Sequence, residues 1–69
     1  MENKIREKRE EVGLSQVRLA VLCGISNSAI SDFERGTRQP WPRVRRALCK
    51  ALNTTKEELF PDESQNGGK

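Results

Sequence analysis

Histidine and tyrosine are absent from this 69-residue chain, and cysteine occurs only twice. Without histidine, the commonest general base is missing, and the serines have no such base nearby. Cys23 and Cys49 are too few and too far apart for a zinc site, which is normally four-coordinate with closely spaced ligands. We therefore expect no enzyme, no metal and no cofactor. Both cysteines are expected to be small buried apolar side chains rather than a disulfide.

Long apolar segments are also absent. No run approaches the ~18 residues that a membrane-spanning helix needs, and residues 1–4 lack the apolar segment of a secretion signal. We therefore expect a cytoplasmic protein without a membrane partner. The length allows one small domain with a compact core, which we place at residues 1–60. Residues 61–69 are polar, and we expect them to be a disordered tail.

Positive charge is concentrated in one part of the chain. The formal net charge is only +3, yet residues 35–50 hold six basic side chains and no acidic one. These are Arg35, Arg38, Arg43, Arg45, Arg46 and Lys50. Such a concentration is expected of a protein that binds a polyanion. A solvated helix face is the simpler alternative.

Caps and turn residues divide the chain into five short helices. Serine and threonine favour helix N-termini, because their side chains accept a hydrogen bond from a free backbone N–H, and glycine favours C-termini. The first expected helix is Lys4–Glu11, ended by Gly13, and the second runs from Gln16 to Gly24 with Ser15 as its cap. The third lies at about 27–34, between Ser26 and Gly36. The fourth runs from Pro42 to Asn53, and a short fifth helix carries Leu59 and Phe60 after a Thr55/Glu58 cap. The sequence predicts an all-α bundle.

The second and third expected helices form the most informative unit. Two short helices joined by a turn with glycine are typical of the helix-turn-helix, which presents the second helix to a DNA major groove about 12 Å wide. The third helix suits this role, because its buried face is formed by Ala29, Ile30 and Phe33. Among its other side chains, four are short and polar, namely Asn27, Ser28, Ser31 and Asp32.

Motifs with unbroken spacing run through this unit and beyond it. They are Leu14-Ser15-Gln16, Leu19-Ala20, Gly24-Ile25-Ser26, Ile30-Ser31, Phe33-Glu34-Arg35-Gly36-Thr37-Arg38-Gln39-Pro40, Ala51-Leu52 and Leu59-Phe60. With these motifs the sequence resembles the Cro/CI-type (XRE) family of helix-turn-helix transcriptional regulators. The resemblance implies a compact five-helix domain of the lambda-repressor type that binds a double-stranded DNA operator, usually as a homodimer. In setting, the chain resembles a stand-alone phage or mobile-element repressor, a restriction-modification controller or an antitoxin.

The resemblance also implies roles for single residues. Side chains that read base edges are Asn27, Ser28, Ser31 and Asp32; asparagine suits adenine and aspartate suits cytosine. Phosphate contacts, which supply affinity without sequence information, are implied for Gln16, Arg35, Thr37, Arg38 and Arg43. Arg9 and Glu34 are expected to form a shielded ion pair between the first and third helices. Two unrelated surface charges are the alternative.

Some positions depart from the family pattern. Val17, Val21 and Leu22 stand where polar residues are common, so they lie either beneath a neighbouring helix or in an exposed apolar strip that meets a protein partner. Arg45 replaces a residue that is often apolar, and we expect it to be free for solvent, phosphate or a partner.

The main expectation is a sequence-specific repressor. The alternative is a protein-interaction module of the same fold, for example an antitoxin-like partner, with weak or no DNA binding.

Overall fold

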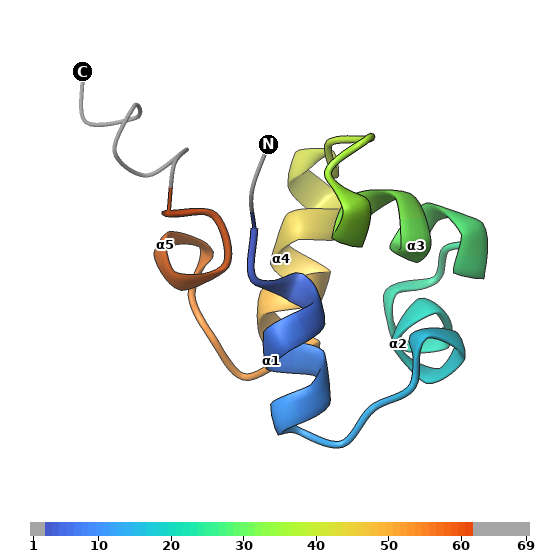
Figure 1. The fold of residues 1–69 in the computed structure, drawn as a ribbon, viewed down its shortest axis with the longest axis horizontal. Helices are drawn as coiled ribbons and strands as arrows, with labels where there is room; N and C mark the ends of the chain where they lie inside the picture. The colour runs from blue at the N-terminus through green and yellow to red at the C-terminus, as the bar shows by residue number, and fades with distance from the viewer. Residues whose placement is uncertain (1–2, 62–69) are drawn as a thin grey trace.

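The computed structural model describes residues 3–61, which contain five helices and, within this range, no strand. The helices are α1 (Ile5–Glu11), α2 (Gln16–Cys23), α3 (Asn27–Arg35), α4 (Pro42–Ala51) and α5 (Lys56–Leu59). In Figure 1, α2 and α3 lie on the right, α5 lies on the left, and α4 lies between them behind α1. The expected five-helix bundle is confirmed. Apart from Pro61, the expected polar tail lies outside the described residues.

The helix boundaries follow the local signals in the sequence. The hydroxyls of Ser15, Ser26 and Thr55 each accept a hydrogen bond from the backbone N–H three residues further on, at 3.0, 3.1 and 3.3 Å. Gly24 and Gly36 end α2 and α3 in the left-handed conformation, with φ of 70° and 77°, which costs glycine little because it has no Cβ. These predicted caps are confirmed.

A few helix ends differ from expectation by one or two residues. The first helix begins at Ile5 rather than Lys4, and α3 continues to Arg35. The fourth helix ends at Ala51, and Asn53 follows with a positive φ of 54°. Asparagine tolerates this conformation better than most residues, so it reverses the chain just after the helix.

The core receives buried apolar side chains from every helix. Its members are Ile5, Leu19, Ala20, Ala29, Ile30, Phe33, Val44, Leu48, Leu52, Leu59 and Phe60. Burying a side chain such as Leu or Phe stabilises a fold by about 1.5–3 kcal/mol. The edge of Trp41 packs against the Phe33 ring, with centroids 6.1 Å apart. Trp41 thereby covers the core where α3 connects to α4.

Arg45 is not free, contrary to expectation. Its Nε donates a hydrogen bond to the Pro40 carbonyl at 3.0 Å. Its guanidinium also lies over the Phe60 ring, 5.3 Å from the centroid, a cation–π arrangement. Arg45 therefore connects the segment before α4 to the residue after α5, and its charge is used within the domain.

Cys23 and Cys49 are free thiols. Both are partly buried against the core rather than fully inside it. Burial raises the pKa of the Cys23 thiol. Burial also raises the pKa of Cys49, with a smaller contribution in the same direction from the negative charge of Glu57. Both thiols are therefore protonated, and weakly nucleophilic, at neutral pH.

None of the helices in residues 3–61 has the length and apolar character needed to cross a membrane.

Candidate nucleic-acid interface

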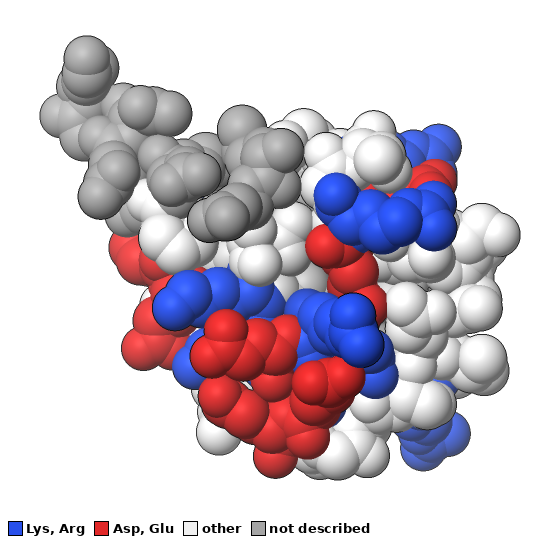
Figure 2. All heavy atoms as spheres, viewed as in Figure 1, with Lys and Arg blue, Asp and Glu red and all other residues white. Residues whose placement is uncertain are grey.

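The outer face of α3 carries the four side chains that the sequence assigned to base reading. Asn27 and Ser28 are exposed, whereas Ser31 and Asp32 are half-buried. The opposite face of the helix is filled by core residues and cannot turn outward. Figure 2 shows no charged side chain over the N-terminal end of α3, at the right of the view. Short neutral side chains therefore cover the end of α3 that would approach a base edge.

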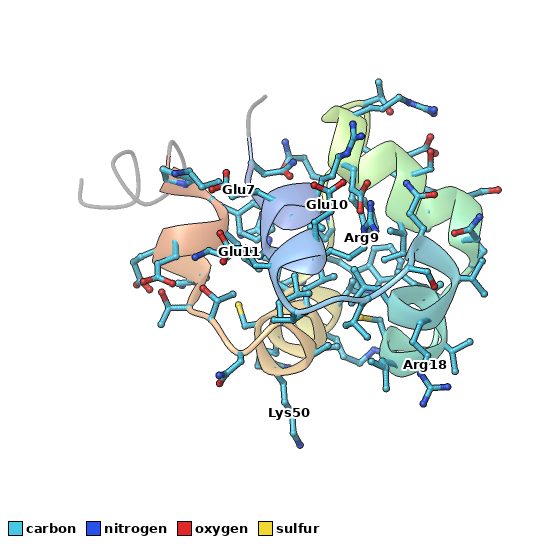
Figure 3. The ribbon with its side chains drawn as sticks, turned by 60° about the horizontal axis from the view of Figure 1, so that its bottom comes forward. Glu7, Arg9, Glu10, Glu11, Arg18 and Lys50 are labelled. Carbon is cyan, nitrogen blue, oxygen red and sulfur yellow. The ribbon has the colours of Figure 1, made fainter. Side chains whose placement is uncertain are left out.

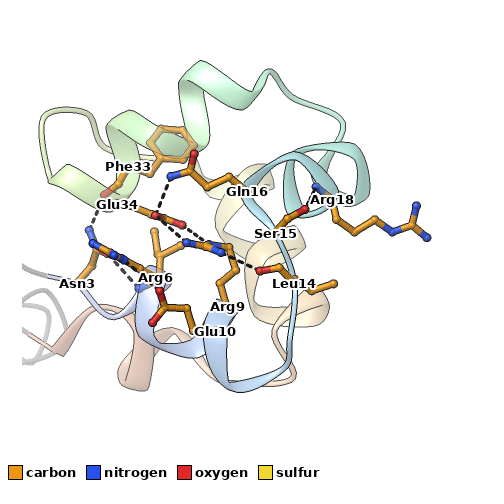
Figure 4. A network of polar contacts seen from close by, with 11 residues as sticks. Asn3, Arg6, Arg9, Glu10, Leu14, Ser15, Gln16, Arg18, Phe33 and Glu34 are labelled. Atoms are coloured by element: carbon orange, nitrogen blue, oxygen red, sulfur yellow. Dashed lines mark hydrogen bonds and ion pairs between the residues drawn. The ribbon is translucent and has the colours of Figure 1, made fainter.

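An ion pair between α1 and α3 fixes the orientation of α3. Arg9 Nε lies 2.6 Å from Glu34 Oε2, with 12% of the Arg9 side chain and 5% of the Glu34 side chain exposed. The Arg9 guanidinium also donates to the Leu14 carbonyl at 2.8 Å. The arginine thus links three parts of the chain, as Figure 4 shows: α1, the loop before α2, and the C-terminal half of α3. The residues that the sequence paired do lie together.

Gln16, the first residue of α2, completes this network. Its Nε2 donates to Glu34 Oε1 at 3.0 Å, so the carboxylate joins α3 to both preceding helices (Figure 4). The sequence assigned Gln16 to phosphate binding. In the free domain one amide hydrogen serves Glu34, and the second is available to another acceptor. Gln16 therefore links the start of α2 to α3 in the free domain.

Asn3 is a positioning residue that the sequence analysis missed. Its side-chain nitrogen donates to the Phe33 carbonyl at 2.7 Å, and its side-chain oxygen accepts from the Ile5 N–H at 3.1 Å. One asparagine thus links the first residue of α1 to the backbone of α3. Asparagine side chains often bond to the backbone two residues further on, which was a usable local signal.

A second ion pair lies on the outer face of α3. Arg35 Nη2 lies 2.6 Å from Asp32 Oδ1, and Arg35 Nη1 donates to the Ser31 hydroxyl at 3.2 Å. This pair is far more open than the first, with 63% of the Arg35 side chain and 33% of the Asp32 side chain exposed. Two residues assigned to base reading are therefore bonded to one assigned to phosphate. The three-residue spacing of Asp32 and Arg35 could have indicated this.

The predicted phosphate contacts that follow α3 differ in whether their side chains are already bonded within the domain. Thr37 donates to the Asp32 carbonyl from both its backbone N–H, at 3.1 Å, and its hydroxyl, at 3.2 Å. Its hydroxyl hydrogen is therefore used to close α3. By contrast, Arg38 and Arg43 are exposed, and neither side chain pairs with another residue of the range 3–61. Arg38, in the loop after α3, and Arg43, in the first turn of α4, are therefore available cations.

A polar hollow lies between α1, α2 and α3. Its volume is about 300 Å³, and it is lined by Arg6, Arg9, Gln16, Ser31, Glu34 and Arg35. Acidic side chains occupy a different part of the surface: Glu7, Glu10 and Glu11 project from α1 (Figure 3). Arg6 and Lys8 of the same helix pair with Glu10 and Glu11, so the charges of α1 largely compensate one another.

The apolar side chains of α2 are exposed. Val17 is 60% exposed, Val21 63% and Leu22 50%, so burial beneath a neighbouring helix is the wrong alternative. The reason is that α2 packs on α3 and α4 through Leu19 and Ala20, which lie on its other side. Arg18 also projects away from the domain (Figure 3).

Comparison with known sequences places the chain in a family. The family profile described as Helix-turn-helix matches residues 5–59, the range that contains all five helices. The chain belongs to the helix-turn-helix family. The resemblance to Cro/CI-type regulators seen in the sequence is thereby confirmed.

Individual relatives of this helix-turn-helix domain are named as regulators. YgzD, an HTH-type transcriptional regulator of Bacillus subtilis (strain 168), is 30% identical over 66 residues, which is 96% of this chain and 100% of YgzD. Repressor protein C2 of Salmonella phage P22 is 35% identical over 60 residues, covering 87% of this chain. The chain spans only 28% of C2. The similarity therefore includes both a protein of matching length and one domain of a longer protein.

A solved structure resembles the helix-turn-helix domain over most of its length. The restriction-modification controller protein C.AhdI from Aeromonas hydrophila superposes with a TM-score of 0.76 at 38% sequence identity. The match covers 83% of this chain and 86% of the C.AhdI chain. The order and packing of the five helices are thus shared with a protein of similar size.

Proposed function

We propose that this DNA-binding transcription regulator acts as a sequence-specific repressor that inserts α3 into the major groove of its operator. Asn27 and Ser28 contact base edges at the start of α3. Arg38 and Arg43 neutralise phosphates on the adjacent backbone. Steric block of a promoter is the simplest consequence of such binding for a small domain.

The observation that carries this proposal is the exposed polar face of α3 beside two cations. Its inner face is locked into the core, and the Arg9–Glu34–Gln16 network holds the helix against α1 and α2. A helix that is fixed in this way approaches the groove without rearrangement, so binding loses little conformational entropy. Arg38 and Arg43, which have no partner within residues 3–61, supply the sequence-independent part of the affinity through counterion release.

Two copies of the chain are proposed to bind a two-fold operator. A short α3 reads only a few base pairs, and pairing two half-sites increases both affinity and specificity. The half-sites would lie about 34–36 Å apart, one helical turn, on one face of the duplex. Assembly on DNA is sufficient for this geometry.

In vitro selection of bound duplexes tests the proposal directly. The full chain is incubated with a random double-stranded library at low salt, and the retained duplexes are sequenced. The expected result is an enriched motif with two-fold symmetry, whose affinity falls steeply as salt rises. Retention of no duplex, or retention without any enriched motif, would contradict sequence-specific binding.

The exposed strip on α2 favours one alternative. Val17, Val21 and Leu22 could contact a protein partner, so that the domain acts mainly as an interaction module with weak or no DNA binding. The two functions respond differently to salt: phosphate contacts weaken steeply with ionic strength, whereas an apolar contact does not. A labelled random duplex that shows no binding even at low salt would favour the interaction module.

A further inference from the structure

We propose that Arg35 and Asp32 act together as one base-reading unit, in which Arg35 contacts a guanine and Asp32 holds it in place. This inference rests on the proposed function, because it assigns a base to one position of α3. It replaces the two separate roles expected from the sequence, a phosphate contact for Arg35 and a cytosine contact for Asp32.

The position of Arg35 on α3 supports base reading. Ser28, Ser31 and Arg35 are separated by three and four residues, so they lie on one face of the helix, opposite the core. Side chains on a helix lean toward its N-terminus, and Arg35 does so. Both of its bonds reach residues three and four positions earlier in the chain. The guanidinium thus lies beside Ser31 and Asp32, at the middle of the outer face of α3.

The bonding of the pair determines which base edge it fits. Asp32 and Ser31 each occupy one N–H group of the guanidinium, and the remaining N–H groups belong to a largely exposed side chain. Guanine presents two acceptors, O6 and N7, to the major groove, and arginine matches both at once. The pair therefore presents hydrogen-bond donors to the groove, which suits guanine.

A cytosine contact by Asp32 is disfavoured for the same reason. Cytosine offers an amino group to an acceptor, so Asp32 would have to share or give up its bond to Arg35. That bond, at 2.6 Å between two charged groups, is of the strong charge-assisted type. Without Arg35, the carboxylate would also face the phosphate charge of the duplex uncompensated.

A phosphate role for Arg35 is disfavoured by charge. The charges of Arg35 and Asp32 compensate each other within the pair, so bringing Arg35 to a phosphate also brings a carboxylate close to it. Arg38 and Arg43 have no such acidic partner in residues 3–61. Arg38 and Arg43 therefore suit phosphate contacts better than Arg35 does.

The experiment measures base preference at single positions. The duplex selected by the wild-type chain is remade with each base pair exchanged in turn, and binding is measured for Arg35→Gln, Asp32→Asn, the double variant and Arg38→Ala. Glutamine removes the guanidinium, and asparagine removes the charge while keeping the shape of the aspartate. The backbone carbonyl of Asp32, which accepts from Thr37, is present in every variant, and circular dichroism verifies folding.

We expect Arg35→Gln and Asp32→Asn to lose base preference at the same G·C pair. The wild type prefers this pair by about 5- to 150-fold, the range for a bidentate contact. Arg35→Gln removes most of this preference, Asp32→Asn reduces it at the same position, and the double variant is no worse than Arg35→Gln alone. Arg38→Ala, the control, keeps the preference and lowers affinity for all duplexes.

Three other outcomes overturn the inference. Loss of a base preference in Asp32→Asn but not in Arg35→Gln would mean that Asp32 reads its base directly. A uniform loss in Arg35→Gln, with a flatter salt dependence, would assign Arg35 to a phosphate. Failure of the wild type to bind any duplex would overturn the proposed function as well, so the two failures are distinguishable.

Discussion

Arg9 of α1 and Glu34 of α3 are separated by 25 positions in sequence, yet Nε and Oε2 lie 2.6 Å apart in an almost fully buried ion pair. Gln16 binds the same carboxylate from α2. Because the three helices meet at one charged group, the orientation of α3 depends on this contact as well as on the core. The pair therefore contributes both to the stability of the fold and to the orientation of α3.

Arg9→Met is expected to destabilise the domain by about 3 kcal/mol, because it leaves the buried Glu34 carboxylate without its cation. Urea unfolding followed by circular dichroism measures this loss. Glu10→Ala is the matched control: it breaks the exposed Arg6–Glu10 pair on the same helix and should change stability by less than about 1 kcal/mol. Equal effects of the two substitutions would contradict a special role for the buried pair.

Asn27→Ala combined with Ser28→Ala is expected to weaken binding to the selected operator. Both side chains are exposed and lie at the start of α3, so their loss removes base contacts and leaves the phosphate contacts intact. Fluorescence anisotropy with the selected duplex and a random duplex checks this. Affinity for the random duplex should be nearly unchanged. If affinity falls equally on both duplexes, α3 is not the element that reads the sequence.

Arg38→Ala is expected to weaken binding to every duplex and to reduce the slope of log affinity against log salt concentration by about one unit. The reason is that the exposed Arg38 side chain has no acidic partner in residues 3–61 and is available to neutralise one phosphate. Titrations at several salt concentrations measure the slope. An altered base preference with an unchanged slope would argue instead for a base contact.

Val17→Ser combined with Val21→Ser is expected to change stability by less than about 0.5 kcal/mol, as is usual for exposed positions. The contrasting substitution on the same helix is Leu19→Ala, which should cost about 2–5 kcal/mol because Leu19 is fully buried. Thermal or urea unfolding compares them. A large loss in the valine double variant would show that the strip is covered in solution by a second copy or another part of the chain.

The two thiols are expected to make stability fall at alkaline pH. Burial raises the pKa of Cys23 and Cys49 above the ordinary value of 9.0, so the unfolded chain loses these protons first as the pH rises. Their contribution is therefore complete below the unfolded pKa and is lost as pH rises through the folded pKa. Unfolding midpoints compared between the wild type and the Cys23→Ala/Cys49→Ala variant, from neutral to alkaline pH, test this. Above about pH 9 the unfolding midpoint of the wild type should fall relative to that of the variant. A difference in midpoint that stays constant with pH would contradict this prediction.

The helix ends were predictable because their signals are local. A hydroxyl at Ser15 or Ser26 caps the next turn, and a glycine at position 24 or 36 adopts a positive φ, whatever the rest of the chain does. The inner face of α3 was predictable for a similar reason, since helical periodicity decides which residues share a side. Whether Val17 and Val21 are buried or exposed was not predictable, because their burial depends on which helices pack against α2.

Sequence alone thus determined the number of helices, their caps and the polar outer face of α3, since these depend on contacts within a few residues. The partners of the long charged and polar side chains were decided only by tertiary structure. Gln16 meets Glu34, Arg45 meets Phe60, and Asn3 meets the backbone of Phe33. Flexible side chains can reach many alternatives, and only the packing of the helices selects one.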